Sequence, residues 1–136
     1  MPGSEIILYF TLPDRDYIYA REFIAKEQLR AEHDIFNDCV GGLAIEGEGG
    51  PIFVEDDFDH IIAALLVAAP DQLERGEHVV FEYYYDPEVL DIRVADDVAT
   101  FSDGQGARVS MPVAQAVTEL KRAHDEMTKL KELVGA

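Results

Sequence analysis

Residues 78–111, HVVFEYYYDPEVLDIRVADDVATFSDGQGARVSM, decide the fold of this chain. Apolar and polar residues alternate along them, which is typical of β-strands, because successive side chains of a strand point to opposite faces of the sheet. Short segments rich in Asp, Gly or Pro interrupt the alternation and are typical of turns: residues 86–88, 95–97 and 103–106. The pattern predicts a meander of three or four antiparallel strands with one polar face.

In the first strand of this meander, every second residue is apolar or aromatic: Val79, Phe81, Tyr83 and Tyr85. We expect this face to contact the helices and to be buried. Tyr84 then lies on the opposite face beside Glu82, as an exposed aromatic residue among acids, and tyrosines in such positions are enriched in protein interfaces. The alternative is that Tyr84 covers a second layer of structure beneath the N-terminal segment.

Two amphipathic helices are predicted to flank the meander, one before it in the sequence and one after it. Residues 57–69 place apolar side chains at helical spacing, follow Asp56 or Asp57 as N-cap, and end at Pro70. Residues 112–133 carry an apolar stripe along their whole length, with lysines in the last turns, where the helix dipole favours cations.

The N-terminal half predicts further strands from short apolar runs: residues 5–12, which end at Pro13, and residues 43–46 and 52–54 around a Gly-rich turn. Between the first two, residues 14–36 predict a helix with Asp14 or Asp16 as its N-cap, although Tyr17–Tyr19 also suits a strand. Residues 37–42, NDCVGG, predict a break.

These elements predict the α+β class: an antiparallel sheet, made of the meander 78–110 plus the N-terminal strands, flanked by two or three helices. A length of 136 residues fits one domain, residues 1–136. Cys39 is the only cysteine, which forbids an internal disulfide. The chain shows neither a secretory signal pattern nor an apolar stretch that spans a bilayer, so we expect a cytoplasmic protein, as a monomer or a homodimer.

Charge is the strongest compositional feature. The formal net charge is −17, and residues 46–103 alone hold sixteen Asp or Glu against two Arg, a net of −14. A negative field of this size repels nucleic acids and anionic membranes and attracts basic proteins. The alternative is that the acids serve solubility only.

A basic protein partner is therefore expected to contact the acids of the first hairpin, of the following turn and of the helix start, around a central aromatic residue. The predicted contact residues are Glu82, Tyr84, Asp86, Glu88, Asp91, Asp96, Asp97, Glu55, Asp56, Asp57 and Asp59.

Signals for catalysis, cofactors or metals are weak. Residues 55–60, EDDFDH, offer ligands to a hard cation, but acids are common at helix starts and the spacing is not that of a calcium loop. Glu82 and Asp91 could pair across the hairpin as general acid and base, although exposed strand faces carry such residues routinely. The histidines lack the spacing of metal ligands. We expect no catalytic residues, no metal site and no cofactor.

The order of elements resembles a known group of proteins. A strand, a capped helix that begins EDDFDHIIAALL, a meander HVVFEYYYDPEVLDIRVADDVATFS and a C-terminal helix follow one another over about residues 43–134. Together with the acidity, this order resembles the small acidic immunity proteins that bacteria keep in the cytoplasm beside polymorphic or contact-dependent toxins. The resemblance implies a non-enzymatic inhibitor that binds one cognate toxin, often a basic nuclease, and blocks its active site. It transfers no residue role by position.

Three functions stay open at this point. The first is an acidic inhibitor or immunity protein, which a broad acidic surface with an aromatic centre and no cleft would favour. The second is a nucleic-acid mimic that inhibits a host defence nuclease, which a two-row acidic ridge would favour. The third is an enzyme or small-ligand domain with an unrecognised site, which a closed pocket with convergent polar groups would favour.

Overall fold

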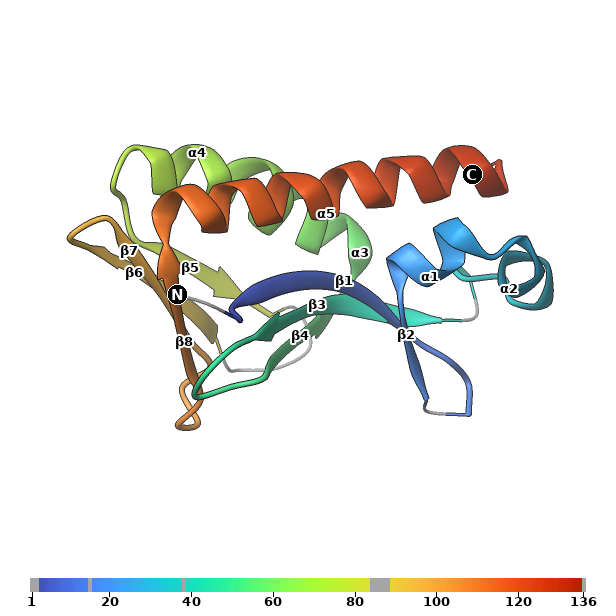
Figure 1. Cartoon of the computed structure of the whole chain (residues 1–136), viewed down its shortest axis with the longest axis horizontal. Coiled ribbons are helices and arrows are strands. Elements are labelled where there is room, and N and C mark those ends of the chain that lie inside the picture. Colours follow the sequence, from blue (N-terminus) through green and yellow to red (C-terminus); the bar gives the residue numbers. More distant parts are fainter. Residues whose placement is uncertain (1–2, 15, 38, 84–88, 136) are drawn as a thin grey trace.

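The structure is a computed structural model that describes residues 3–14, 16–37, 39–83 and 89–135. It has the expected α+β class, with two antiparallel sheets of four strands each (Figure 1). The N-terminal sheet has the strand order β2-β1-β3-β4, and its strands are β1 (Glu5–Thr11), β2 (Tyr17–Tyr19), β3 (Val40–Glu46) and β4 (Ile52–Asp56).

The C-terminal sheet is the meander that the alternating sequence predicts. Its strands follow one another in the order β5-β6-β7-β8 and are β5 (Val79–Glu82), β6 (Val89–Ala95), β7 (Val98–Ser102) and β8 (Arg108–Pro112). Val79 and Phe81 are buried and Val80 and Glu82 are exposed, which confirms the expected faces of β5. Tyr84 and Tyr85 lie outside the described residues.

The expected single sheet is wrong in one respect: the N-terminal strands form a sheet of their own. A helical run of residues 58–74 connects β4 to β5, and these two strands belong to different sheets. They meet where the turn between β3 and β4 reaches β8, and there the Arg108 N–H donates to the Gly49 carbonyl at 3.1 Å.

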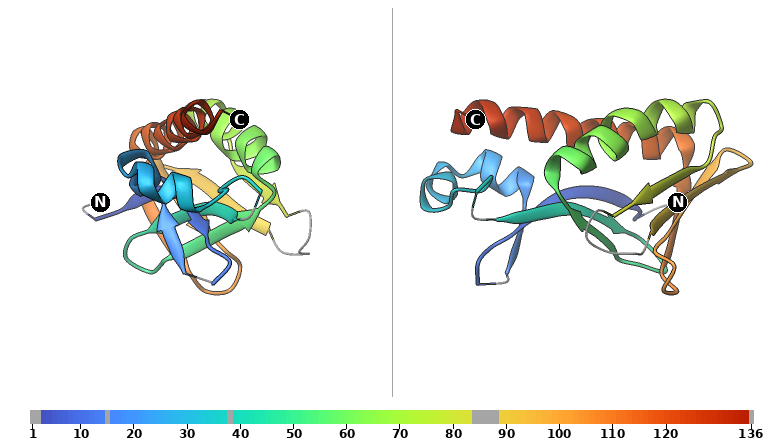
Figure 2. Two further views of the ribbon diagram at one scale, coloured as in Figure 1. Left: turned by 90° about the vertical axis from the view of Figure 1, so that its right-hand side faces the viewer. Right: turned by 180° about the vertical axis from the view of Figure 1, so that it is seen from behind.

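One layer of helices covers the same side of both sheets (Figures 1 and 2). The longest helix, α5 (Val113–Val134), runs along this layer and confirms the predicted C-terminal helix. Beside it lies the helical run made of α3 (Phe58–Ile61), the π-helix η1 (Ile62–Ala68) and α4 (Ala69–Glu74). The short helices α1 (Ala20–Ala25) and α2 (Glu27–Glu32) lie near the C-terminal half of α5.

The prediction that the helix over residues 57–69 ends at Pro70 is wrong, because the helical run continues to Glu74. Proline cannot donate a backbone hydrogen bond, and its ring clashes with the carbonyl four residues earlier in an α-helix. The preceding turns are π-helical, and the Ala69 N–H donates to the Ala64 carbonyl, five residues earlier. Pro70 therefore lies in the first turn of a new α-helical segment, where no N–H is needed.

The predicted helix over residues 14–36 is also wrong in its first part. Tyr17–Tyr19 form strand β2, which pairs antiparallel with β1 and places Tyr19 opposite Tyr9. Asp14, expected as an N-cap, instead accepts a hydrogen bond from the Asp16 N–H at 3.1 Å in the connecting turn. A helix then begins at Ala20 but breaks at Lys26, whose backbone is extended. Pairing with β1 outweighs the helical spacing of the apolar residues here.

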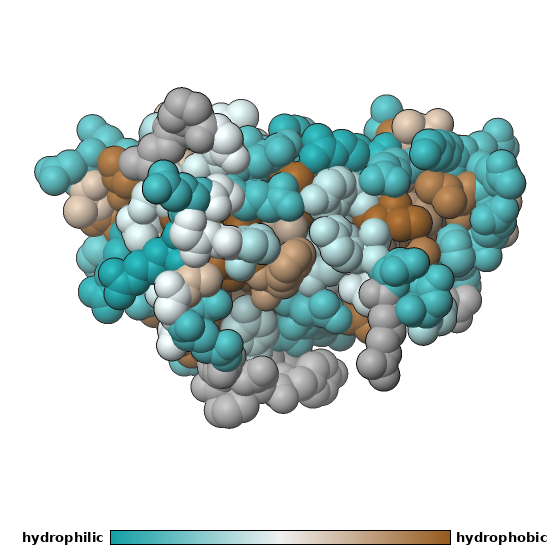
Figure 3. Space-filling model, turned by 60° about the horizontal axis from the view of Figure 1, so that its bottom comes forward, coloured by the Kyte–Doolittle hydropathy of each residue, from teal (hydrophilic) through white to brown (hydrophobic). Residues whose placement is uncertain are grey.

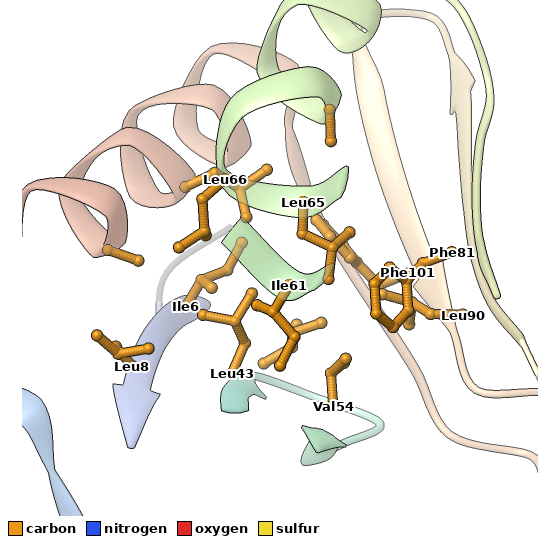
Figure 4. Close-up of a cluster of buried hydrophobic side chains, with 14 of the residues drawn as sticks. Ile6, Leu8, Leu43, Val54, Ile61, Leu65, Leu66, Phe81, Leu90 and Phe101 are labelled. Carbon is orange, nitrogen blue, oxygen red and sulfur yellow. The ribbon is translucent and has the colours of Figure 1, made fainter. Parts of the chain in front are cut away.

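Most of the buried side chains form one cluster that joins both sheets to the helices (Figure 4). The N-terminal sheet contributes its inner face, the helical run its apolar stripe, and the C-terminal sheet the face of Phe81. The side chains labelled in Figure 4 are Ile6, Leu8, Leu43, Val54, Ile61, Leu65, Leu66, Phe81, Leu90 and Phe101. In the part of the chain that the structure describes, this packing leaves the opposite face of the N-terminal sheet without a helical cover.

The turn between β6 and β7 gives a first stability prediction. Asp96 and Asp97 connect the paired residues Ala95 and Val98, with φ angles of 51° and 61°. A two-residue turn with both φ angles positive prefers glycine at its second position. Asp97→Gly should therefore raise the free energy of unfolding by roughly 0.5–1 kcal/mol, measured by urea denaturation. Asp97→Ser removes the same charge without the conformational freedom, and an equal gain from both variants would contradict the explanation.

Candidate protein-binding face

The outer face of the N-terminal sheet, which points away from the helices, carries the most distinctive side chains of the molecule. Alternation along β1 sends Ile6, Leu8 and Phe10 into the core and Ile7 and Tyr9 outward. Neighbouring strands add Tyr17 and Tyr19 from β2, Ala44 from β3, and Phe53 and Glu55 from β4. Figure 3 shows apolar and weakly polar side chains across the middle of this side, with hydrophilic side chains around them.

Four of these residues form an aromatic cluster, which we call the aromatic face: Tyr9, Tyr17, Tyr19 and Phe53. The ring centroids of Tyr9, Tyr17 and Phe53 lie 5.6–5.9 Å from one another, with the rings mostly edge to face. Tyr9 is 2% exposed, whereas Tyr17 is 51% and Phe53 45% exposed. The aromatic face therefore has a buried base and a solvent-exposed top, and edge-to-face pairs of this kind stabilise by about 0.5–1.5 kcal/mol each.

Two tyrosine hydroxyls hold two carboxylates on this face. The Tyr9 hydroxyl donates to Glu55 Oε2 and the Tyr19 hydroxyl to Glu46 Oε1, each at 2.8 Å. Within the described ranges, neither Glu46 nor Glu55 forms an ion pair with Lys, Arg or His. The two carboxylates thus have fixed positions at the border of the aromatic face and keep their charge available to a partner.

The contact between Tyr9 and Glu55 depends on Gly42. The strand register places Gly42 of β3 between Tyr9 of β1 and Glu55 of β4. Gly42 has no side chain, so the Tyr9 ring can cross β3 and reach the carboxylate. A Cβ atom at Gly42 would overlap the Val54 carbonyl oxygen, so the close approach of β4 requires glycine here.

These hydrogen bonds also shift the ionisation of the tyrosines. Burial and then the bond to Glu55 raise the pKa of Tyr9, and the bond to Glu46 raises the pKa of Tyr19 to about 12. Both pKa values exceed the ordinary value of 10.0. The stability linked to them is therefore complete below pH 10 and is lost as the pH rises toward the folded-state pKa values.

Tyr9→Phe should accordingly weaken the alkaline loss of stability. We expect the free energy of unfolding of the wild-type chain to fall steadily above pH 10, and that of the variant to fall less steeply, because Tyr9 no longer favours unfolding by ionising. Urea unfolding at a series of pH values, with tyrosinate absorbance recorded in parallel, measures both effects. If the free energy of unfolding fell equally steeply with pH for the two chains, folding would not raise the pKa of Tyr9, and the explanation would be wrong.

The predicted contact acids at the helix start have three different environments. Glu55 lies at the border of the aromatic face, bonded to Tyr9. Asp57 is the N-cap of α3 and accepts from the Asp59 N–H at 2.9 Å, while Asp59 itself is exposed. Asp56 is only 8% exposed, and its Oδ1 accepts from the Asp57 N–H at 2.7 Å. The predicted contact needs an exposed carboxylate at this position, whereas the Asp56 side chain is buried and bonds the backbone.

The remaining predicted contacts belong to the C-terminal sheet or to undescribed residues. Glu82 is exposed on β5, and Asp91 on β6 forms an ion pair with Arg93 at 3.3 Å. Asp96 and Asp97 are exposed at the tip of the β6–β7 turn. Three residues lie outside the described part of the chain: Tyr84, Asp86 and Glu88. Of the predicted residues that it describes, the structure thus places only Glu55 at the border of the aromatic face.

Sequence reasoning missed the aromatic residues themselves. Tyr17–Tyr19 suits a strand by residue type, and Tyr9 shares its parity with Ile7 in β1, so both signals were present. Their convergence with Phe53 could not be inferred, because it depends on the strand order β2-β1-β3-β4, which joins residues far apart in the sequence.

Beside this face lies a hollow of about 460 Å³ lined by Cys39, Val40, Gly41, Glu55, Asp56, Asp57 and Phe58. Its acids Asp56 and Asp57 accept hydrogen bonds from backbone N–H groups, as expected at a helix start. Among the residues that the structure describes, no group of three or more His, Cys, Asp or Glu side chains could hold a metal ion. The hollow therefore shows no arrangement for metal chemistry in the described ranges.

A search of the described helices finds none with the length and apolarity needed to cross a membrane. Comparison of the chain with protein-family models, with curated proteins and with solved structures finds no match.

Proposed function

We propose that this chain is a non-enzymatic acidic inhibitor, comparable to an immunity protein, which neutralises a basic toxin or effector protein. It binds this partner through the outer face of the N-terminal sheet. The observation that carries the proposal is the aromatic face, with Tyr17 and Phe53 exposed at its top and Glu46 and Glu55 fixed at its border.

Exposed aromatic residues in a cluster support a protein contact. Aromatic side chains are enriched at the centres of protein interfaces, where a few residues contribute most of the binding energy. Tyr17 and Phe53 are two of the large hydrophobic side chains that remain exposed, and they touch each other across the sheet, with ring centroids 5.8 Å apart. A protein surface that covers them would bury a rigid apolar centre at little cost in side-chain entropy.

Charge supports a basic partner. The net charge of −14 over residues 46–103 would attract a basic protein, and Glu46 and Glu55 both belong to this stretch. Carboxylates at the border of an interface mainly speed association and select partners of opposite charge. An aromatic centre with an acidic border also suits a flat inhibitory contact better than a catalytic pocket.

The test uses the wild-type chain and the double reversal Glu46→Lys/Glu55→Lys. Each is immobilised and exposed at low salt to an extract of the producing organism, and the captured protein is identified, purified and assayed for its own activity with and without added chain. We expect a basic protein that the wild type captures, that the reversed variant loses, and whose activity stops when the wild-type chain is added. Capture that survives the reversal, or activity that the chain leaves unchanged, would overturn the proposal. Circular dichroism of the variant checks its fold.

A further inference from the structure

We infer that the side chain recognised by the aromatic face is an arginine of the partner, whose guanidinium lies on the exposed rings of Tyr17 and Phe53 and bonds the carboxylates of Glu46 or Glu55. This inference rests on the proposed function and names the chemistry of its partner. Arg21, which belongs to helix α1 and whose guanidinium reaches two side chains of this sheet, supports it.

Arg21 shows how this face accommodates a guanidinium. Its guanidinium carbon lies 5.2 Å from the centroid of the Tyr19 ring, and its Nη1 lies 3.3 Å from Glu5 Oε1. Glu5 and Tyr19 both belong to the outer face, at the border of the aromatic face. One cation is thus already held there by an aromatic ring and a carboxylate together.

The middle of the face repeats the same two components. Exposed rings are supplied by Tyr17 and Phe53, and carboxylates by Glu46 and Glu55. Each carboxylate accepts one tyrosine hydroxyl, and a carboxylate can accept about four hydrogen bonds, so each keeps capacity for further donors. The tyrosines already fix the carboxylates in place, so their side chains lose less conformational entropy when a partner binds.

Ring spacing favours arginine over lysine. The centroids of Tyr9, Tyr17 and Phe53 lie 5.6–5.9 Å apart, so the rings touch one another and leave no gap that encloses a compact ammonium ion. A cation must then lie on the outer surface of the rings. The flat and weakly hydrated guanidinium stacks well on such a surface and still presents N–H groups to carboxylates, whereas an ammonium ion is strongly hydrated there.

Three synthetic peptides of equal length test the inference: alternating Gly-Arg, Gly-Lys and Gly-citrulline. We expect the arginine peptide to bind the wild-type chain at least about fivefold more tightly than the lysine peptide, which corresponds to a difference of about 1 kcal/mol between the stacked guanidinium and the more strongly hydrated ammonium ion. Citrulline, which is flat but neutral, should bind most weakly. Titrations followed by NMR should shift the ring signals of Tyr17 and Phe53. In Tyr17→Leu/Phe53→Leu the preference for arginine should disappear, and in the matched control Val80→Leu/Val89→Leu it should persist.

The outcomes separate this inference from the proposed function. Equal binding of the arginine and lysine peptides, no binding of the arginine peptide, or an arginine preference that survives Tyr17→Leu/Phe53→Leu would each overturn the inference. The proposed function then stands if, in the capture experiment, the Glu46→Lys/Glu55→Lys variant fails to bind the protein that the wild-type chain captures. If that variant also keeps the partner, both are overturned. Thermal unfolding of each variant shows whether a lost signal comes from a lost fold.

Discussion

Gly42→Ala should destabilise the chain by more than about 4 kcal/mol, a large fraction of the stability of an ordinary domain. The added Cβ would overlap the Val54 carbonyl oxygen, which belongs to the backbone of the neighbouring strand and cannot rotate away. Relief requires β3 and β4 to separate, and that separation would also pull Glu55 away from Tyr9. Urea unfolding, followed by circular dichroism, measures the loss.

Gly104→Ala is the matched control for this variant. Gly104 has a φ angle of 76°, and a Cβ atom added there would meet nothing within 4 Å, so alanine is opposed only by the backbone preference, about 1–2 kcal/mol. The comparison of the two variants separates the effect of the overlap between the added Cβ and the neighbouring strand from the effect of losing glycine's conformational freedom. If Gly42→Ala costs no more than Gly104→Ala, the close approach of β4 to β3 is not the reason for glycine at this position.

Tyr17→Ser/Phe53→Ser should lower the affinity for the identified basic partner by about a hundredfold or more. The loss of each aromatic side chain from the centre of an interface typically costs about 1.4–2 kcal/mol of binding free energy. Most of this change should come from faster dissociation, since short-range aromatic contacts form after the encounter. Surface plasmon resonance at two salt concentrations measures both rates.

A second pair of exposed residues gives the control for this experiment. Val80 and Val89 lie on the outer side of the C-terminal sheet and are similarly exposed, 56% and 37%. Val80→Ser/Val89→Ser should leave both rates within about twofold of wild type. If the two double variants weakened the complex equally, the contact would not be specific to the outer face of the N-terminal sheet, and the proposed site would be wrong.

Local patterns predicted the elements of this fold well where each element depends on its own residues. Alternation over residues 78–111 predicted the meander, and helical spacing predicted α5, because both patterns record which side chains face the core. The glycines of NDCVGG were interpreted as a break, yet they lie inside β3. Gly41 makes room for the Phe58 ring and Gly42 for the Val54 backbone, and such contacts come from distant residues.

The candidate site was harder to predict for the same reason. The net charge indicates a basic partner without placing it, since an acidic composition is shared by many surfaces. Tyr9 and Glu55 are 46 residues apart in the sequence, and their bond exists only because β1, β3 and β4 are neighbours. Strand order is a property of the whole fold, so the aromatic face becomes visible only when the sheet is assembled.

Photo-crosslinking from the sheet surface tests the central claim most directly. p-Benzoylphenylalanine is introduced at position 53, in place of a phenylalanine, and in a second chain at position 80, which is exposed on the other sheet. Both chains are irradiated in an extract of the producing organism, and crosslinked proteins are identified by mass spectrometry. A basic protein joined at position 53 and absent at position 80 is the predicted result. The same protein joined at position 80, with none at position 53, would contradict the proposal that the outer face of the N-terminal sheet binds the partner.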